Sequence, residues 1–296
     1  HAYASAVADA PADIWASLAQ SQHRIGALYV AEDSYRMALE RAPGDLEIQY
    51  QLAALLVELG RSGEAGPLLT RLAETAPSGR VLHELLCARL LVCDWTDFDA
   101  IVDKLRAHMA GLPENPGDTL IPLNSLALPF SPSELLTVAR RFADTYRRPN
   151  RPRVRRSATP AAGRRLKLGY VSTDFRTHPT AHLLTELWER HDRKRFDVYA
   201  YSIGAGQDSP LRRPIQGAFE HFVDASTESV ERTTQRIRAD GIDILIDLNG
   251  YTSGSRVEIF VPGAAPVQMH WLGFLGTQGA EWFDYIITDR FVTPPE

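Results

Sequence analysis

The residue whose type and position best suit a catalytic role is His178, which directly precedes Pro179 in the polar segment spanning residues 172–182. Proline is favoured at the first position of a helix, so we expect His178 at a helix N-cap, beside the end of the preceding strand. The partial positive charge at a helix N-terminus disfavours an imidazolium, which leaves the ring neutral and able to accept a proton. A capping or buried histidine without chemistry is the alternative interpretation. For His182, one turn further on, packing is the expected role.

Two further segments combine glycine with polar side chains after apolar runs. They are Asn249-Gly250-Tyr251-Thr252 and residues 273–279, which include Gly276 and Thr277. In a parallel α/β sheet, ligands bind beyond the carboxyl ends of the strands. We therefore expect both segments to lie on one rim together with His178.

Familiar cofactor and metal motifs are missing. Gly204 and Gly206 form a GxG, but Ser209 stands where a third glycine would complete the dinucleotide fingerprint, and there is no GxxxxGK[ST] phosphate loop. His178 and His182 lack the HExxH order and an obvious third ligand, so we expect no metal ion.

The last part of the chain, residues 166–296, alternates strand-like and helix-like segments. Helices are expected at 182–193 and 230–239, and strands at 166–172, 196–202, 221–224, 242–248, 266–273 and 283–289. This alternation predicts a Rossmann-like, doubly wound α/β domain, in which the apolar segment 242–248 is a central strand.

The first part, residues 1–110, repeats with a period of 34 residues, the distance from Pro43 to Pro77. Matching columns of bulky, leucine, alanine and proline residues follow the tetratricopeptide pattern of paired helices, which predicts an all-α solenoid. Ala31, Ala38 and Ala65 are expected at helix–helix contacts, because small side chains let the two helices approach closely.

Both ends of this helical region carry further expectations. Tyr3, Ala6 and Pro11 resemble the end of an earlier repeat, so we expect more repeats before residue 1. Residues 81–110 have helical leucine spacing, and Trp95 is expected to anchor the core under the last helix pair. A solenoid of this kind offers a surface for a partner or substrate, and a rigid spacer is an equally good interpretation.

Residues 111–165 are expected to connect the two parts, with a proline-rich composition and one helix at about 133–146. Nine cations and no acid occupy the stretch from 147 to 167. A nucleic-acid contact could use such a run, but the stretch lacks aromatic residues for base stacking. A solvated linker is therefore the preferred interpretation.

The composition sets the broad class of protein. A net charge of −5, with 44% hydrophobic and 23% charged residues, is typical of a globular protein and argues against a general nucleic-acid binder. Two cysteines, Cys87 and Cys93, cannot form a disulfide framework, which favours the reducing cytoplasm. No apolar run approaches the roughly 18 residues of a membrane span, and the first residues do not form a signal peptide.

The motifs, taken in order, resemble one known family. The tetratricopeptide repeats are followed by Cys-Asp-Trp, Leu-Gly-Tyr-Val-Ser-Thr-Asp-Phe-Arg-Thr-His-Pro-Thr, Asp-Leu-Asn-Gly-Tyr-Thr, Ala-Pro-Val-Gln and Trp-Leu-Gly-Phe-Leu-Gly-Thr. This order resembles a bacterial member of the O-linked N-acetylglucosamine transferase and SPINDLY family. The resemblance implies the N-terminal half of a GT-B glycosyltransferase, with the partner half absent, so the chain alone is expected to be inactive.

The resemblance also implies a reaction and a site. The reaction is an inverting transfer, without a metal or cofactor, from a nucleotide-sugar donor, UDP-GlcNAc being favoured, to Ser or Thr of acceptor proteins presented by the repeats. His178 corresponds to an active-site histidine that has been proposed as the general base. The acceptor and sugar cleft would contain Pro179, Thr180, Asn249, Gly250, Tyr251, Gly276 and Thr277.

Two residues depart from the family pattern. Leu275 and Gln278 flank Gly276-Thr277, where family members often have proline before the glycine and a small residue after the threonine. The alternatives to N-acetylglucosamine transfer are a protein O-fucosyltransferase of SPINDLY type and a non-catalytic tetratricopeptide interaction protein.

Overall fold

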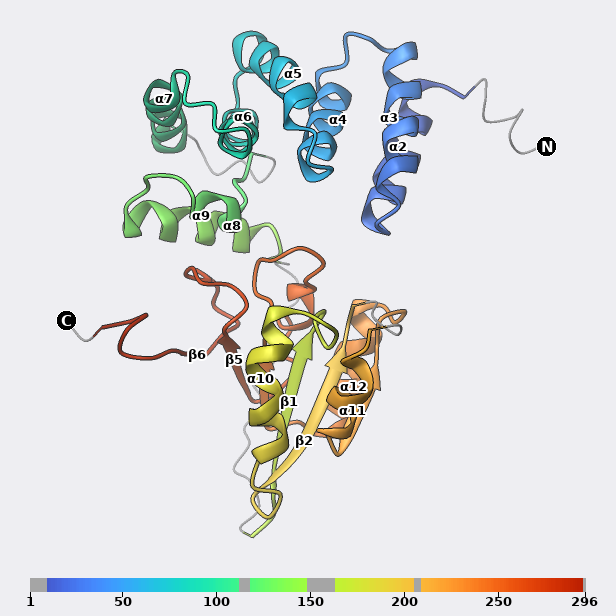
Figure 1. The fold of residues 1–296 in the computed structure, drawn as a ribbon, viewed down its shortest axis with the longest axis vertical. Coiled ribbons are helices and arrows are strands. Elements are labelled where there is room, and N and C mark those ends of the chain that lie inside the picture. Colours follow the sequence, from blue (N-terminus) through green and yellow to red (C-terminus); the bar gives the residue numbers. More distant parts are fainter. Residues whose placement is uncertain (1–9, 112–117, 148–162, 205–208, 295–296) are drawn as a thin grey trace. The chain divides into compact units, whose positions relative to one another are not determined.

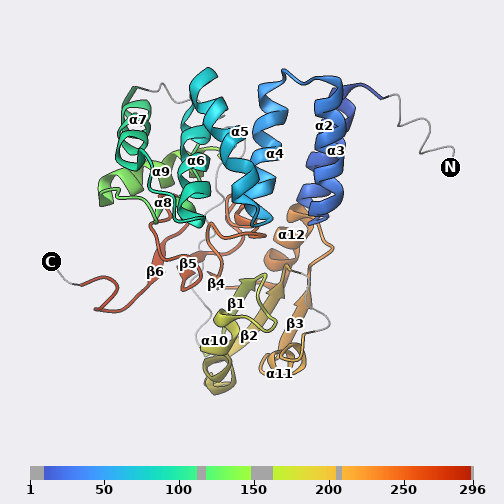
Figure 2. The same cartoon turned by 45° about the horizontal axis from the view of Figure 1, so that its top comes forward.

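The computed structural model describes residues 10–111, 118–147, 163–204 and 209–294. The chain separates into two compact units, one ending at Leu120 and the other beginning at Ile121 (Figures 1 and 2). The division lies inside the segment 111–165 that we predicted as a connector. The predicted helix at 133–146 is present as α9 (Pro132–Asp144) and belongs to the second unit, as does the short α8 (Pro122–Ser125).

The first unit is a stack of helix pairs, as the repeat predicts. Its described helices are α2 (Ala12–Arg24), α3 (Leu28–Arg41), α4 (Leu46–Glu58), α5 (Ser62–Thr75), α6 (Gly79–Leu91) and α7 (Phe98–Gly111). Each helix packs against its neighbours in the chain, and Figure 2 shows them as a row. Ala31, Ala38 and Ala65 are fully buried, which confirms the expectation that they lie at close contacts. Tyr3 and Ala6 lie outside the described residues.

The prediction for Trp95 was wrong. Its side chain is 63% exposed and packs edge-to-face on Phe98, with ring centroids 5.3 Å apart. The chain turns sharply between α6 and α7, where Cys93 and Asp97 both have positive φ, at 56° and 53°. This turn carries the indole outward instead of under the last helix pair.

The second unit contains a six-stranded parallel sheet in the order β3-β2-β1-β4-β5-β6. The strands are β1 (Leu166–Ser172), β2 (Phe196–Ser202), β3 (His221–Asp224), β4 (Ile244–Asp247), β5 (Val267–Trp271) and β6 (Tyr285–Ile287). Their alternation with helices confirms the predicted doubly wound α/β class. The last three strands are shorter than the apolar segments that predicted them, because their ends continue into loops.

Helices cover both faces of this sheet. The helices are α10 (Pro179–Arg190), α11 (Arg212–Gly217) and α12 (Val230–Asp240), with the 3-10 turn η1 (Val257–Ile259). Trp188 of α10 and Ile215 of α11 belong to one apolar cluster with β1, β2 and β4 residues, whereas Ile237 of α12 and Ile259 of η1 belong to another. The two clusters are the two cores of a sandwiched sheet.

The strand order reverses between β1 and β4, which are paired in parallel with Leu168 opposite Ile244 and Val171 opposite Asp247. Chain connections leave the two strands in opposite directions at such a switch point, and in α/β sheets ligands bind there, beyond the carboxyl ends of the strands. The loops after β1 and β4 begin there, as the sequence predicts for His178 and Asn249.

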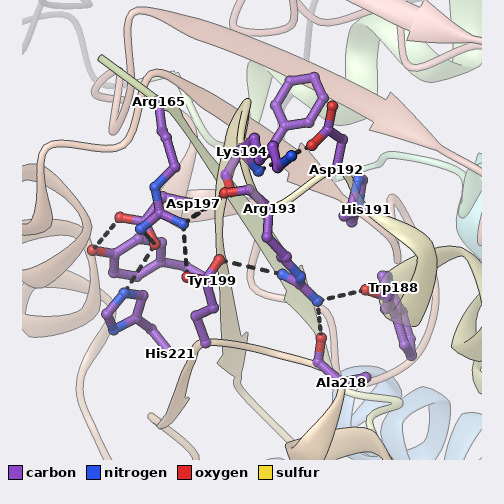
Figure 3. A network of polar contacts seen from close by, with 12 residues as sticks. Arg165, Trp188, His191, Asp192, Arg193, Lys194, Asp197, Tyr199, Ala218 and His221 are labelled. Carbon is purple, nitrogen blue, oxygen red and sulfur yellow. Dashed lines mark hydrogen bonds and ion pairs between the residues drawn. The ribbon is translucent and has the colours of Figure 1, made fainter.

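The amino end of the sheet is held by charged side chains (Figure 3). Arg165 contacts Glu220 at 2.8 Å and Asp197 at 3.5 Å, and the His221 ring also contacts Asp197, at 3.0 Å. His221 stacks on Tyr199 with centroids 4.0 Å apart. These contacts fix the starts of β1, β2 and β3 relative to one another.

Ion pairs and hydrogen bonds near the amino end of the sheet account for part of the basic stretch from 147 to 167. Arg164 forms a two-point ion pair with Asp243, with both distances 2.6 Å, and the Lys167 ammonium donates to the Asp240 carbonyl at 2.7 Å. Arg147 contacts Glu281 at 3.2 Å. The described cations of this stretch therefore bind within the protein, and the arginines from 148 to 156 lie outside the described residues. None of the helices within the described ranges is long and apolar enough to cross a membrane.

Candidate functional site

Three loops meet the carboxyl edge of the sheet: the first loop (residues 173–178, after β1), the second loop (248–256, after β4) and the third loop (272–284, after β5). His178 caps α10, with Pro179 at the first helical position, as the sequence predicts. Its Nδ1 accepts a hydrogen bond from the Thr180 backbone N–H at 3.3 Å, and it lies 3.7 Å from a carboxylate oxygen of Asp174. The side chain is 35% exposed, so part of the ring is accessible to solvent.

His182 is exposed, so its predicted packing role was wrong. The helix begins three residues earlier than predicted, since Pro179 starts it and His178 caps it. With this start, Ala181, Leu184 and Trp188 turn toward the sheet, whereas Leu183 is 67% exposed. His182 lies beside Leu183 on the outer side.

Asn249 fastens the second loop to the first. Its side-chain oxygen accepts from the Thr173 backbone N–H at 2.8 Å, and its Nδ2 donates to the Thr173 hydroxyl at 2.8 Å and to Asp174 at 2.9 Å. Asn249 is 2% exposed, so it joins the two loops from the interior of the protein. An amide suits this task because it accepts at one atom and donates twice at the other.

The second loop is in turn joined to the third. The Tyr251 hydroxyl donates to the Gln278 carbonyl at 2.7 Å, and its ring packs on Phe274 and Phe142 with centroids 5.5 and 4.9 Å away. Burial raises the pKa of Tyr251, so its hydroxyl stays protonated and keeps donating. Gly250 has φ +59° and fits tightly against Phe274 and Gln278, which explains why a glycine is needed there.

A cavity of about 780 Å³ lies between α9, the third loop and β6. Its lining includes Arg140, Gly276, Thr277, Gln278 and Tyr285. Gln278 is only 8% exposed, and neither polar atom of its side chain has a hydrogen-bond partner among the described residues. Leu275 is 78% exposed on the same loop. The two residues that depart from the family pattern therefore differ in environment, since Gln278 is buried and Leu275 is exposed.

The predicted site residues fall into two groups. His178, Pro179, Gly276 and Thr277 are at least partly exposed, whereas the side chains of Thr180, Asn249 and Tyr251 are buried, and so is Gly250. Hydrogen bonds join the first loop to the second and the second to the third. The cavity lining includes Gly276 and Thr277 but not the residues predicted on the first and second loops.

Sequence reasoning missed the buried acids that organise these loops. Asp247, 3% exposed, accepts from the backbone N–H groups of Asn249 at 3.0 Å and Gly250 at 2.9 Å. Asp174, 7% exposed, accepts a hydrogen bond from Asn249 Nδ2 and also contacts Arg176 at 3.2 Å. An acid at the end of an otherwise apolar central strand was the available signal. Within the described ranges, no group of three or more His, Cys, Asp or Glu residues could hold a metal ion.

Arg212 is another support that the sequence did not reveal. It is 4% exposed and donates to the Phe175 carbonyl of the first loop at 3.2 Å, to the Ser202 hydroxyl at 2.6 Å and to Asp224 at 2.9 Å. It thereby links the carboxyl ends of β2 and β3 to the loop that carries His178.

The chain combines helix pairs of tetratricopeptide type with a Rossmann-like sheet, whose loops are linked at the switch point. This combination defines a helical solenoid followed by an α/β domain. The sequence profile of glycosyl transferase family 41 matches residues 92–296. The chain belongs to this family.

Relatives agree with that assignment. The chain is 34% identical to the probable UDP-N-acetylglucosamine–peptide N-acetylglucosaminyltransferase SEC of Arabidopsis thaliana, over 72% of this chain and 22% of the relative. It is 35% identical to the UDP-N-acetylglucosamine–peptide N-acetylglucosaminyltransferase of Caenorhabditis elegans, over 69% of this chain and 19% of the relative. The chain thus spans about a fifth of the length of these curated relatives.

A solved structure shows the same arrangement. The K341M mutant of the Thermobaculum terrenum O-GlcNAc transferase is 25% identical and superposes with a TM-score of 0.69. The match covers 96% of this chain and 54% of that chain. The likeness confirms the fold class and the resemblance to a bacterial member of the family.

Proposed function

We propose that this chain is the acceptor-side portion of an inverting protein O-glycosyltransferase, which transfers N-acetylglucosamine from UDP-GlcNAc to Ser or Thr hydroxyls of acceptor proteins. The observation that carries the proposal is the family match over residues 92–296, which includes the capped His178 loop and the two loops fastened to it. This chain covers 54% of the solved relative's chain, and we propose that the residues that bind the sugar donor correspond to the remainder.

His178 is the proposed catalytic residue. Because its Nδ1 accepts from Thr180 N–H, a neutral ring in this arrangement carries its hydrogen on Nε2. That nitrogen can donate a hydrogen bond to an acceptor hydroxyl or a sugar oxygen. To act as a general base, the ring must first give up the capping bond. The described geometry thus favours positioning by hydrogen-bond donation over proton abstraction.

The other site residues divide by exposure. Pro179, Gly276 and Thr277 are proposed to border the cleft for acceptor and sugar, since they are the accessible ones. The four buried residues, Thr180 at the start of α10 and Asn249, Gly250 and Tyr251 on the second loop, are proposed to hold the cleft in shape. The helix pairs of the first unit are proposed to present acceptor proteins. We propose no metal or cofactor for the transfer.

The test is sugar transfer by the full-length protein with His178→Ala. Removing a hydrogen-bond donor aimed at the reacting groups typically costs about 10²–10³-fold in rate, so kcat should fall by that factor while binding of the sugar donor stays unchanged. His182→Ala is the matched control, because this exposed histidine lies one turn along the same helix. Mass spectrometry of acceptor proteins records the added sugar. Wild-type turnover by a folded His178→Ala protein rejects the role.

The same assay separates base from positioner. A general base produces an acid limb in the pH–rate profile that vanishes in His178→Ala. A hydrogen-bond donor leaves the shape of the profile unchanged and lowers the rate across it. We expect the second outcome from the Nδ1 contact.

A SPINDLY-type enzyme is the second candidate. The Arabidopsis thaliana protein named probable UDP-N-acetylglucosamine–peptide N-acetylglucosaminyltransferase SPINDLY is 29% identical over 45% of this chain, against 34% over 72% for the SEC protein. The longer and closer match is to the SEC protein, and both proteins are named as N-acetylglucosaminyltransferases, which supports N-acetylglucosamine as the proposed sugar. Transfer from GDP-fucose with no transfer from UDP-GlcNAc would reverse this choice. Absence of transfer from either donor, with acceptor binding retained, would support a non-catalytic interaction protein.

A further inference from the structure

The connection from β2 to α11, described at residues 203–204 and 209–212, contains the incomplete glycine motif. Gly204 opens the motif, Gly206 lies outside the described residues, and Ser209 stands where a dinucleotide fingerprint has its third glycine. Both described residues of the motif lie against the first loop, which ends at His178. The motif therefore contacts the protein itself, and its residues need an explanation other than dinucleotide binding.

Gly204 brings the backbone of the connection directly against Thr173, the first residue of the loop. The Ile203 N–H donates to the Ser172 carbonyl at 3.0 Å, which continues the pairing of β2 with β1 up to this point. A Cβ on Gly204 would lie 2.5 Å from the Thr173 carbonyl oxygen and 2.8 Å from its Cα. Both are backbone atoms, so only a glycine allows this approach without moving the loop.

Ser209 holds the other end of the loop. The Thr177 backbone N–H donates to the Ser209 hydroxyl at 2.6 Å, and the hydroxyls of the two residues are 3.0 Å apart. Thr177 directly precedes His178, so this contact fixes the peptide that leads into the proposed catalytic side chain. A glycine at position 209 would lack the hydroxyl, so the residue that breaks the fingerprint is the one that makes the contact.

Arg212 holds the middle of the loop. Its guanidinium donates to the Phe175 carbonyl at 3.2 Å, and its backbone N–H donates to the Ser209 carbonyl at 2.9 Å, so both residues belong to one turn at the start of α11. The connection thus contacts every second residue of the loop from 173 to 177. Asn249 binds the start of the same loop from the β4 side. The loop is therefore held from both strands that neighbour β1.

We propose that Ser209 and Arg212 are positioning residues for sugar transfer, which hold the backbone before His178 in place from the β2 side. Arg176 and Thr177 are exposed, so packing against the core does little to hold this end of the loop, and hydrogen bonds from the connection do so instead. Neither positioning residue touches substrate in this scheme. Their effect on the rate rests on the proposed function, whereas their hold on the loop does not.

The first test measures the loop in the chain itself, without activity. In Ser209→Ala the Thr177 amide loses its acceptor, so its hydrogen exchange, followed by NMR, should accelerate roughly three- to tenfold, the factor that one hydrogen bond contributes. The matched control is Ser229→Ala, which removes the hydroxyl that accepts from the Arg232 N–H at 3.2 Å and should leave Thr177 exchange unchanged. Unchanged Thr177 exchange in folded Ser209→Ala, or equal acceleration in both variants, overturns the proposed hold on the loop.

The second test measures sugar transfer by the full-length enzyme. A displacement of about 1 Å at a reacting group can cost about 10²-fold in rate, so kcat of Ser209→Ala should fall by about ten- to a hundredfold, with KM for the sugar donor unchanged. Ser209→Thr keeps the hydroxyl and should keep most of the rate, and Ser229→Ala should keep all of it. Wild-type kcat in Ser209→Ala, or an equal loss in Ser209→Thr, contradicts the positioning role.

The third test asks whether the effect on the rate passes through His178. When one side chain acts only through another, the losses caused by the two substitutions do not add in free energy. The double variant of Ser209→Ala with His178→Ala should therefore turn over as slowly as His178→Ala alone. A further loss as large as that of Ser209→Ala alone would show that Ser209 acts without His178, and it would overturn the proposal.

Arg212→Lys tests the second positioning residue. Arginine reaches the Phe175 carbonyl and Asp224 with two different nitrogens, and the single nitrogen of lysine cannot reproduce this fork. The folded variant should show a lower kcat with unchanged KM for the donor, and a wild-type kcat would remove Arg212 from the proposal. Ser209 is only half-buried, so its variants decide the proposal if Arg212→Lys does not fold. An inactive wild-type enzyme would refute the proposed function, and the exchange measurement would still decide whether the connection holds the loop.

Discussion

Gly250 is the position where a single methyl group should damage the site most clearly. Its φ of +59° lies in the left-handed region, where a residue with a Cβ costs about 1–2 kcal/mol more than glycine. A Cβ there would also lie 2.6 Å from Gln278 Nε2, 2.6 Å from Phe274 Cβ and 2.8 Å from His270 Cε1. Overpacking of this kind costs about 1–3 kcal/mol. We therefore expect Gly250→Ala to destabilise the second unit by about 2–5 kcal/mol.

The matched control is Gly254→Ala. Gly254 lies on the same loop with φ +74°, but a Cβ there would meet only Thr173 Cγ2, at an ordinary 3.6 Å. The free energy of unfolding of this variant should fall only by the cost of a left-handed backbone at alanine, about 1–2 kcal/mol. The difference between the two variants isolates the clash against Phe274, Gln278 and His270.

The assay is thermal unfolding of the chain, followed by the indole NMR signals of Trp188, Trp271 and Trp282, which all lie in the second unit. For a unit of this size, each kcal/mol lowers the midpoint by roughly 2–4 °C. Equal shifts for Gly250→Ala and Gly254→Ala would refute the reasoning, because they would show that the three loops separate without cost. A wild-type midpoint for Gly250→Ala would refute the φ argument as well.

Two further predictions concern the helical unit. Ala38 is fully buried, so Ala38→Leu should overpack the helix pair and cost about 1–3 kcal/mol of unfolding free energy, and an unchanged melting midpoint would show that the pair has room. Burial, with a smaller effect of the Glu58 charge, raises the pKa of Glu84 from its usual 4.5 to about 7. The folded protein then holds this proton more tightly than the unfolded chain, so stability should fall as the pH rises through this interval. Glu84→Gln should flatten that dependence in calorimetry and unfold at a higher temperature than wild type at pH 8, whereas parallel curves would contradict it.

The regular elements could be predicted because their signals are local. The strands expected at 166–172, 196–202 and 221–224 have the bounds that the structure gives to β1, β2 and β3. The alanine columns of the repeat gave the buried contacts of the helix pairs, since a 34-residue period needs no knowledge of distant segments. His178 at the helix cap followed from one proline.

The rest of the site could not be predicted, because it depends on residues far apart in the sequence. The bond from Thr173 to Asn249 joins positions 76 apart, and that from Asp247 to His270 joins positions 23 apart. Neither pair has a spacing that a periodic pattern could reveal. The prediction for Trp95 was wrong for a different reason. Two residues with positive φ in its turn redirect the chain, and the residue types alone do not predict such a turn.

The pairing of β1 with β4 has a consequence for synthesis. β1 ends at Ser172 and its neighbour β4 begins only at Ile244, so about seventy residues must be made between them. Translation adds about 5–20 residues per second, so β4 is synthesised roughly 4–14 s after β1. During that time β1 can pair only with β2, and its other edge, which carries Leu168 and Tyr170, is open to strands from other chains. Slowed translation between residues 173 and 243 should therefore raise aggregation of the nascent protein, although the finished fold has no exposed edge there.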